Sequence, residues 1–275
     1  QHEELFRRKG LPALFNEAGF DTWFISNQSQ QGAMIDRLAH DARHLVYIRS
    51  PRHDMQLLEE VQKAVRRSSS PRLFFILHCY GSHFSYHERY PREFARFLPD
   101  GNVSIAPQNA RELCNAYDNS VCYTDHFLAE TIAYLRSLSG VSSAVLYCAD
   151  HGEDLLDDER QRFLHASPTA TAYQLWVASL AWFSPDYRAA FPGVAETAAA
   201  NSDVPANTHA LFHTMAQIAA ISSPYVRDSV SLVSPAFDRR APRYYLNDHN
   251  EAVPYLRAGL RPQDLEVFRK NGIEL

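Results

Sequence analysis

The sequence lacks any apolar run long enough to cross a lipid bilayer. A membrane-spanning helix needs about 20 predominantly apolar residues, whereas the run 73–77 is short and the segment 174–184 is interrupted by polar side chains. The chain also has no basic segment followed by an apolar one at its start, and its first residue is Gln1 rather than Met. We therefore expect any export signal or membrane anchor to lie outside this sequence.

The sequence also lacks an excess of positive charge. It has 27 Lys and Arg against 32 Asp and Glu, for a formal net charge of -5. Proteins that bind nucleic acids usually carry a basic stripe that neutralises phosphates. The one modest basic cluster, Arg66 and Arg67, ends a helical pattern, where cations interact favourably with the helix dipole. Nucleic acid is therefore not an expected partner.

Cysteines are few, and none are spaced as in metal-binding CxxC motifs. Two of the four cysteines, Cys114 and Cys122, lie in one predicted helix, too far apart to form a disulfide with each other. The other two, Cys79 and Cys148, end two apolar strands. We expect buried free thiols, so cysteine usage does not indicate a cellular compartment.

Short apolar segments alternate with helical patterns along most of the chain. Strands are predicted over 20–26, 45–48, 73–77, 144–148 and 175–183, and helices over 3–18, from Met34, over 54–67, over 117–135 and after a capping Thr208. Strands that are apolar on both faces and separated by helices indicate a mainly parallel sheet with helices on both sides. We predict a single domain over 1–275 with a three-layer αβα fold.

The end of the chain has a different character. Five prolines, from Pro224 to Pro262, interrupt residues 222–275. We predict a mostly irregular C-terminal extension with a short last helix near 264–270.

Potential metal ligands follow the strand 144–148 directly. The residues are Ala149-Asp150-His151-Gly152-Glu153, and Asp and His are both suitable zinc ligands. Gly152 would give the backbone the freedom for a sharp turn. Taken alone, the motif is better interpreted as an ordinary loop, in which Asp150 caps a turn and His151 is solvated.

Histidines in two further loops change this interpretation. His78 and His83 follow the strand 73–77, and His165 lies downstream of Asp150. The spacing of His78 and His83 does not place them on one face of a helix, which favours a loop. Function in parallel sheets collects at the carboxyl ends of strands. Together these histidines favour a metal site over an ordinary loop.

Six segments of the sequence resemble the phosphoethanolamine transferases of the alkaline phosphatase and sulfatase superfamily. They occur in that family's order and spacing from about Leu11 to Ile221. The segments are Thr22-Trp23-Phe24-Ile25-Ser26-Asn27-Gln28, Leu77-His78-Cys79-Tyr80-Gly81-Ser82-His83, Tyr117-Asp118-Asn119-Ser120-Val121-Cys122-Tyr123-Thr124-Asp125, Ala149-Asp150-His151-Gly152-Glu153, Leu164-His165 and Thr208-His209-Ala210-Leu211-Phe212-His213-Thr214.

The resemblance implies an alkaline-phosphatase-like fold and a zinc centre. Asp150 and His151 would bind the catalytic Zn²⁺, and His83 and His165 would face the substrate phosphate or a second zinc ion. His165 would act as a general acid or as a phosphate binder.

The resemblance also implies residues that line the substrate pocket. These are Asn27 and His78, together with His83 and His165. The helix from Tyr117 would be mainly structural.

The implied reaction is zinc-dependent transfer of phosphoethanolamine from phosphatidylethanolamine to lipid A or another envelope glycan or lipid, through a phospho-threonine intermediate. The family's threonine nucleophile and a further acidic zinc ligand belong to segments upstream of the helix 3–18. Thr22 lies inside a strand and is not assigned this role. We therefore expect an N-terminally incomplete, monomeric catalytic domain, inactive in isolation, from the periplasmic face of the bacterial inner membrane, with membrane contact through a segment absent here.

One departure from the family and two alternative functions remain. Leu155-Leu156-Asp157-Asp158 follows Glu153 where relatives usually keep a small or glycine-containing turn. The chain could instead belong to a sulfatase or phosphodiesterase-type hydrolase of the same superfamily. It could also be a catalytically inactive fragment or binding domain, which predicts no zinc.

Overall fold

The computed structural model describes residues 9–30, 32, 34–49, 53–101, 104–165, 169–247, 249 and 251–273. The first part of the helix predicted over 3–18 lies outside the described residues. The chain divides into two compact units, residues 1–133 and 134–275. Each unit has a sheet of its own.

The first unit is built on a parallel sheet of three strands. Its strands are β1 (Asp21–Ser26), β2 (His44–Tyr47) and β3 (Leu73–His78), in the order β2-β1-β3. Ser26 and His78 are register partners at the ends of β1 and β3. The loops that follow these two strands therefore leave the sheet at the same edge.

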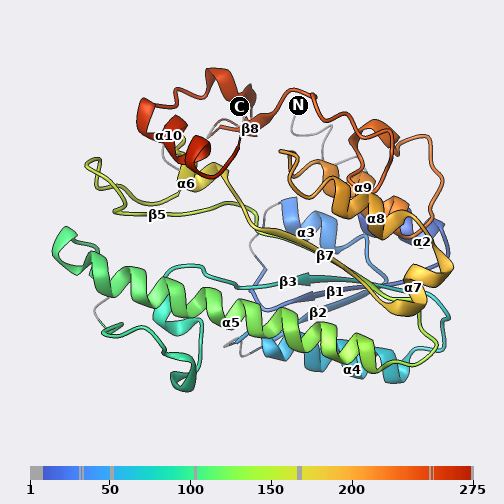
Figure 1. Cartoon of the computed structure of the whole chain (residues 1–275). Coiled ribbons are helices and arrows are strands. Elements are labelled where there is room, and N and C mark those ends of the chain that lie inside the picture. Colours follow the sequence, from blue (N-terminus) through green and yellow to red (C-terminus); the bar gives the residue numbers. More distant parts are fainter. Residues whose placement is uncertain are drawn as a thin grey trace. The chain divides into compact units, whose positions relative to one another are not determined.

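Helices cover both faces of this sheet, as predicted. Figure 1 shows α4 (Met55–Arg67) on one face and α2 (Leu11–Glu17) and α3 (Met34–Ala39) on the other. The Phe15 ring of α2 stacks on Phe74 of β3 with centroids 3.7 Å apart. Residues of α4 at helical spacing are buried, namely Leu57, Leu58, Val61 and Ala64. Burial of these apolar faces holds the three layers together.

A long connection follows β3 and ends in the longest helix. It contains the short 3-10 turns η1 (Tyr86–Glu88), η2 (Arg92–Phe94) and η3 (Pro107–Asn109). The helix α5 (Ala110–Ser137) begins earlier than the predicted Tyr117 and runs into the second unit.

The sheet of the second unit is antiparallel. It pairs β4 (Ala144–Cys148) with β7 (Ser179–Phe183), in the register Ala144 to Phe183. The predicted strand 175–183 is shortened because its first residue ends the helix α6 (Ala172–Leu175), which the Thr171 hydroxyl caps by accepting a hydrogen bond from Gln174 N. The three-stranded sheet of the first unit is parallel, and only the shorter pair of the second unit is antiparallel. The architecture is therefore αβα with a mainly parallel sheet.

Helices α7 (Pro185–Ala190), α8 (Val194–Ala200) and α9 (Ala210–Ile218) complete the second unit's core. The buried residues of this core are Phe183, Tyr187, Ala195, Ile218 and Val233. The expected cap of α9 by Thr208 is wrong. The residue at the N-cap is His209, in a helical conformation and without a side-chain cap, while Thr208 accepts Leu211 N only through its carbonyl, at 3.0 Å.

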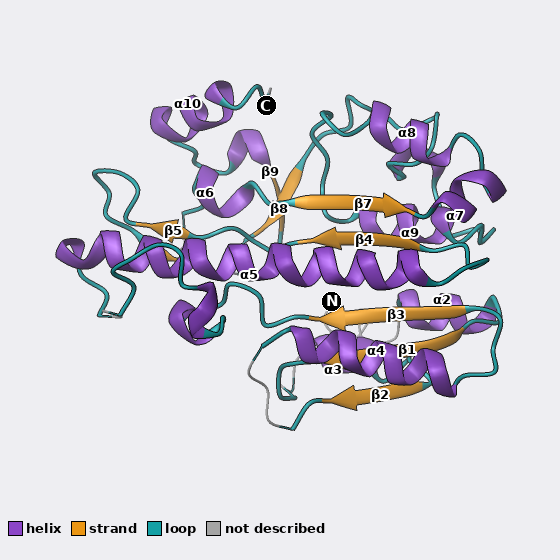
Figure 2. Ribbon diagram, turned by 60° about the horizontal axis from the view of Figure 1, so that its bottom comes forward, coloured by secondary structure: helices purple, strands orange, loops and turns teal. Residues whose placement is uncertain are grey.

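The C-terminal region is mostly irregular but contains a hairpin that was not predicted. Its elements are η4 (Asp228–Val230), the antiparallel pair β8 (Tyr244–Leu246) and β9 (Ala252–Pro254), η5 (Tyr255–Arg257) and α10 (Pro262–Lys270). Figure 2 shows α10 beside α6, which it contacts. The four cysteines are free and half-buried. Within the described part of the chain, no helix has the length and apolarity needed to cross a membrane.

Candidate functional site

A short hairpin carries two of the potential metal ligands. β5 (Asp154–Leu155) pairs with β6 (Phe163–Leu164) in the antiparallel register Asp154 to Leu164. Glu153 and His165 flank this pair, so the register sets them opposite each other. His165 Nδ1 lies 2.8 Å from Glu153 Oε1, and the Glu153 side chain is only 6% exposed.

Gly152 has a different role from the one predicted. Its backbone does not adopt the left-handed conformation that several other glycines show. A Cβ at this position would lie 2.0 Å from the carbonyl oxygen of Tyr173, and Gly152 N donates to Gln174 O at 2.8 Å. Residues 149–153, called the metal loop below, run directly against the backbone of α6. Glycine is needed at position 152 because a side chain would not fit there.

Among the residues that the structure describes, one group has the donors of a metal site. His151, Glu153 and His165 each offer a ligand atom, and these atoms lie within 4.8 Å of one another. The two imidazole rings have centroids 3.7 Å apart. Two nitrogens and one carboxylate oxygen form a set typical of zinc.

The hydrogen bonds of the two histidines determine which ring nitrogen can bind a metal. His151 Nδ1 lies 2.9 Å from Gly152 O, and His165 Nδ1 faces the Glu153 carboxylate. A carbonyl and an ionised carboxylate only accept, so Nδ1 of each ring carries the proton. Each neutral ring then offers the lone pair of Nε2, in the arrangement usual for metal-binding histidines. The donor set therefore fits zinc.

The Asp150 carboxylate lies beside the His151 ring. Its Oδ2 lies 3.7 Å from His151 Nε2, and its side chain is 90% exposed. Two ligands of a tetrahedral zinc ion lie roughly 3.3–3.5 Å apart, so the predicted pair is spaced for one ion. Asp150 does not belong to the group of His151, Glu153 and His165. His151 thus belongs both to the predicted pair with Asp150 and to the group with Glu153 and His165.

A buried ion pair fixes the loop between β5 and β6. Arg160 donates to both oxygens of Asp264 at 2.9 Å and also pairs with Asp158. Asp264 is fully buried and additionally accepts from Ala172 N at 3.0 Å. Burial by itself would raise the pKa of Asp264, but these hydrogen bonds outweigh it, and the pKa lies below its usual value. The C-terminal helix α10 therefore holds the hairpin that carries Glu153 and His165.

Backbone strain accompanies this hairpin. Three non-glycine residues, Leu156, Gln161 and Leu164, have φ angles of 64°, 47° and 67°. Such conformations cost energy and persist only where the surrounding structure imposes them. Leu164 immediately precedes His165, so the unusual backbone conformation of Leu164 sets the direction in which the chain presents this potential metal ligand.

In the first unit, Asn27 joins the ends of β1 and β3. It is fully buried, its N–H donates to His78 O at 3.0 Å, and its Nδ2 donates to Asp54 Oδ1 at 2.9 Å. Its Oδ1 is buried and has no hydrogen-bond partner among the residues that the structure describes. Asp54, itself 5% exposed, also accepts from the backbone of Tyr80 and Gly81 at 2.8 Å each. One carboxylate therefore ties both strand-end loops together.

His78 and His83 lie at the same edge of the sheet, in different settings. His78 is half-buried, with Nδ1 2.9 Å from Ser26 Oγ. His83 is exposed, with Nδ1 2.6 Å from Phe84 O, and its carbonyl accepts from Arg89 Nε at 3.0 Å. The Arg89 guanidinium also lies over the Tyr80 ring, 3.9 Å from its centroid. Arg89 and Asp54 together hold the loop that carries His83.

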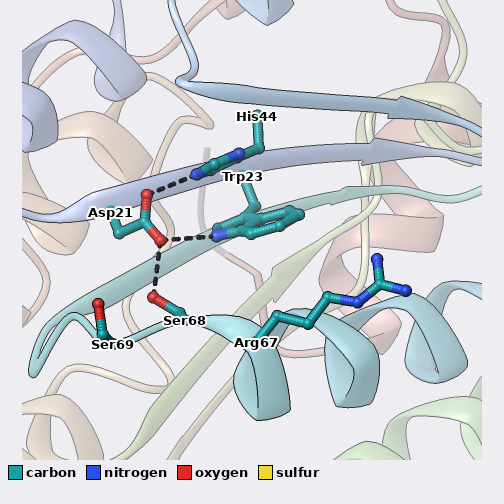
Figure 3. A pocket seen from close by; sticks show the side chains of 6 residues that line it. All are labelled: Asp21, Trp23, His44, Arg67, Ser68 and Ser69. Atoms are coloured by element: carbon teal, nitrogen blue, oxygen red, sulfur yellow. Dashed lines mark hydrogen bonds and ion pairs between the residues drawn. The ribbon is translucent and has the colours of Figure 1, made fainter.

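The opposite edge of this sheet has a hollow of about 280 Å³. Figure 3 shows Asp21, the first residue of β1, hydrogen-bonded to His44 Nε2 at 2.7 Å, Ser68 Oγ at 2.8 Å and Trp23 Nε1 at 3.3 Å. Burial opposes ionisation of Asp21, but these bonds outweigh it and lower its pKa. Because the polar groups satisfy one another, we interpret the hollow as structural. Arg67 and Ser69 complete its lining.

The predicted site residues thus fall into two groups. Asn27, His78 and His83 belong to the first unit, and Asp150, His151 and His165 belong to the second. Two functional residues were missed. Glu153 was quoted in the motif without a role, although an acidic residue so close to Asp150 was a usable signal. Asp54 was taken as the start of a helix, and nothing in the sequence connects it to the distant Tyr80.

Comparisons with known proteins identify the class of this chain. The family model described as Sulfatase matches residues 4–221. The chain therefore belongs to the sulfatase family.

Proteins similar to this chain include some that are named phosphoethanolamine transferases. Over 67% of its length, the chain is 32% identical to the Kdo(2)-lipid A phosphoethanolamine 7''-transferase of Escherichia coli (strain K12), of which it spans 33%. The chain is thus similar to part of a phosphoethanolamine transferase and spans about a third of that relative's length.

Solved structures agree with this assignment. The C-terminal periplasmic domain of EcEptC from Escherichia coli has a TM-score of 0.76 and 25% identity over 88% of this chain and 70% of that domain. A second structure of that domain is a complex with zinc, with a TM-score of 0.76, 23% identity, and coverage of 91% of this chain and 72% of that one. The integral membrane protein EptA from Neisseria meningitidis has a TM-score of 0.73 and 25% identity over 82% of this chain and 44% of that one. The chain therefore shares its fold with these solved structures.

Proposed function

We propose that this chain is the zinc-binding part of a transferase that moves phosphoethanolamine from phosphatidylethanolamine to lipid A or another envelope lipid or glycan. The observation that carries the proposal is the group formed by His151, Glu153 and His165 in a chain of this family. The transferase would act as a monomer at the periplasmic face of the inner membrane.

In this proposal the metal is held mainly by the second unit. His151 and His165 offer Nε2, and the exposed Asp150 offers a carboxylate oxygen. Bound zinc lowers the pKa of a nucleophile and neutralises charge on phosphoryl oxygens. Glu153 acts indirectly, because its hydrogen bond to Nδ1 fixes the orientation and the tautomer of His165.

We assign the substrate phosphate to histidines at the strand ends. With Nδ1 fixed by Glu153, His165 has an alternative role: when Nε2 is protonated and binds no metal, it can donate a hydrogen bond to a phosphate oxygen or a proton to a leaving oxygen. In the first unit, we propose that the exposed His83, whose carbonyl accepts from Arg89, contacts the substrate together with Asn27 and His78 at the strand ends.

The proposed chemistry has two displacements at phosphorus. A threonine oxygen forms a bond to phosphorus while the bond to diacylglycerol breaks, and the diacylglycerol oxygen takes a proton. An acceptor hydroxyl then loses its proton, attacks the phospho-threonine, and releases the threonine oxygen. We place this threonine in a segment outside the present chain, which covers 70% of the solved EcEptC domain. On its own this chain would bind zinc without catalysing transfer.

The test uses the whole protein that contains this chain. Cells expressing His151→Ala or His165→Ala should add phosphoethanolamine to lipid A at least about 100-fold more slowly than wild type, measured by mass spectrometry of the extracted lipid. The control is His87→Ala, which removes an exposed histidine and should change the rate less than about twofold. Undiminished transfer by His151→Ala would overturn the proposal, and release of sulfate from sulfate esters would favour the sulfatase alternative.

A further inference from the structure

A rigid loop of the first unit presents apolar side chains to solvent. The loop comprises residues 95–101, beside the first half of α5 (Figure 1), and is called the Phe97 loop below. Asn119 of α5 is fully buried beneath it. Its Oδ1 accepts from Arg96 N at 2.8 Å and Phe97 N at 2.9 Å, and its Nδ2 donates to Phe97 O at 3.0 Å. The Asn119 side chain thus makes the hydrogen bonds that the backbone of an exposed loop usually makes with water.

The far end of the same loop is fixed as well. Asp100 is 4% exposed and accepts from the Tyr90 hydroxyl at 2.7 Å and from Arg92 at 3.1 Å. Asn115 donates to Pro99 O at 2.8 Å. Burial, together with the bond to Asp100, raises the pKa of Tyr90 to about 12, so its hydroxyl stays a donor at neutral pH. The conformation of the loop is therefore determined along its length.

Despite this anchoring, two large apolar side chains point outward. Phe97 is 44% exposed and Leu98 is 51% exposed. Exposure of apolar surface on an ordered loop is unfavourable in water and marks a contact site when it accompanies other recognition groups. The guanidinium of Arg92 is on a side chain that is 77% exposed, and Arg96 is exposed too, with Glu93 as the acidic residue between them.

We propose that the Phe97 loop docks on a bilayer surface that carries anionic lipid. Phe97 and Leu98 enter the boundary between headgroups and acyl chains, and Arg96 and Arg92 pair with lipid phosphates. The charge of the loop favours an anionic lipid surface as its partner, because guanidinium groups beside apolar side chains complement a surface of phosphates over hydrocarbon. The inference deepens the proposed function, since it rests on both substrates of that reaction being lipids.

The experiment measures binding of the chain to vesicles. Vesicles of phosphatidylethanolamine and phosphatidylglycerol at about 3:1 serve as the probe, with neutral phosphatidylcholine vesicles for comparison. We expect the chain to sediment with the anionic vesicles, and the double variant Phe97→Ser with Leu98→Ser to lose at least about tenfold in affinity. Arg96→Ser, which leaves the anchoring pair of Arg92 and Asp100 intact, should lose affinity most at low salt, because salt screens the charges of both surfaces.

The matched control removes an exposed leucine elsewhere. Leu256 is 86% exposed and lies in the second unit, so Leu256→Ser should bind within about twofold of wild type. Every altered side chain is exposed, and circular dichroism should show the variants folded. Equal vesicle binding by the Phe97 and Leu98 variant and wild type overturns the proposal. Concentration-dependent dimerisation lost in that variant, without vesicle binding, assigns the loop to a second copy and overturns it too.

The outcome is independent of catalysis. Vesicle binding is measured without substrate turnover and in the presence of a zinc chelator. Loss of docking with intact zinc binding and transfer would remove this inference alone, whereas intact docking without transfer would remove the proposed function alone.

Discussion

Glu153 and His165 face each other across the β5–β6 hairpin, with Oε1 2.8 Å from Nδ1. The same carboxylate belongs to the group of metal donors. A carboxylate bonded to Nδ1 lies away from the side of the ring that Nε2 faces, so Glu153 orients His165 toward a metal ion rather than binding that ion itself. A buried carboxylate in this role should influence metal affinity more than an exposed carboxylate does.

We predict that Glu153→Gln lowers zinc affinity about 10–100-fold. The amide is a weaker acceptor for the Nδ1–H of His165, and it can present an N–H to that group instead. Competition with a chromogenic chelator measures the affinity. Asp186→Asn, which alters an exposed carboxylate of α7, should bind zinc as wild type does. Equal affinities for Glu153→Gln and wild type would show that Glu153 has no part in the site.

The backbone contact at Gly152 gives a second prediction. In Gly152→Ala the new Cβ would meet the Tyr173 carbonyl oxygen at 2.0 Å, so the loop or α6 must shift. The free energy of unfolding should fall by about 1–3 kcal/mol or more. Denaturant unfolding measures it. Gly101→Ala is the control, because a Cβ there meets nothing within 4 Å; if both variants are equally stable, the contact is not as tight as described.

Gly152 also shows where sequence reasoning about the site was limited. The motif made this glycine conspicuous, and the prediction attributed it to a sharp turn. The reason is instead a neighbouring backbone, Tyr173, that comes close only after α6 has packed against the metal loop. Contacts of this kind depend on tertiary structure, which a local motif does not contain.

A third prediction concerns the carboxylate that joins the strand-end loops of the first unit. Asp54→Ala removes the acceptor for Asn27, Tyr80 and Gly81 and leaves buried donors unpaired. We expect a loss of about 3 kcal/mol of stability. Amide hydrogen exchange should also become faster at Tyr80 and Gly81 specifically. Asp125→Ala, at an exposed position of α5, should leave both amides protected, and unchanged exchange in Asp54→Ala would contradict the assignment.

The strands were easier to predict than their partners. Apolar runs located β1, β3 and β4 to within a residue or two, because a buried strand must be apolar along its length. The antiparallel pairing of β7 with β4 was not visible, since a short apolar run has no direction. The β5–β6 hairpin was missed because it is held mainly by polar contacts, such as that of Arg160 with Asp264.

That ion pair supplies a fourth prediction. Asp264→Ala leaves the Arg160 guanidinium, 8% exposed, without its main buried partner, and should cost about 3–5 kcal/mol. Because the pKa of Asp264 is lowered in the folded protein, its contribution is present above the unfolded value near 3.8 and is lost as pH falls through the folded pKa. The stability difference between wild type and Asp264→Asn should therefore shrink in strong acid. A double-mutant cycle with Arg160→Met checks the pairing: additive effects would show that the two side chains do not interact.

The last prediction is a pH dependence near neutrality. His213 is 7% exposed, and its Nδ1 accepts from Arg227 N at 3.1 Å. Burial, and then the charges of Arg227 and His209, lower its pKa below 6.5. The unfolded chain therefore binds a proton at a higher pH than the folded one, so the free energy of unfolding should fall as pH decreases below about 6.5. His213→Asn keeps an acceptor for Arg227 N but does not titrate, and its stability should depend less on pH between about 7.5 and 5. His87→Asn, at an exposed histidine, should follow the wild-type curve. Parallel curves for His213→Asn and wild type would mean that His213 is not the group whose protonation destabilises the fold.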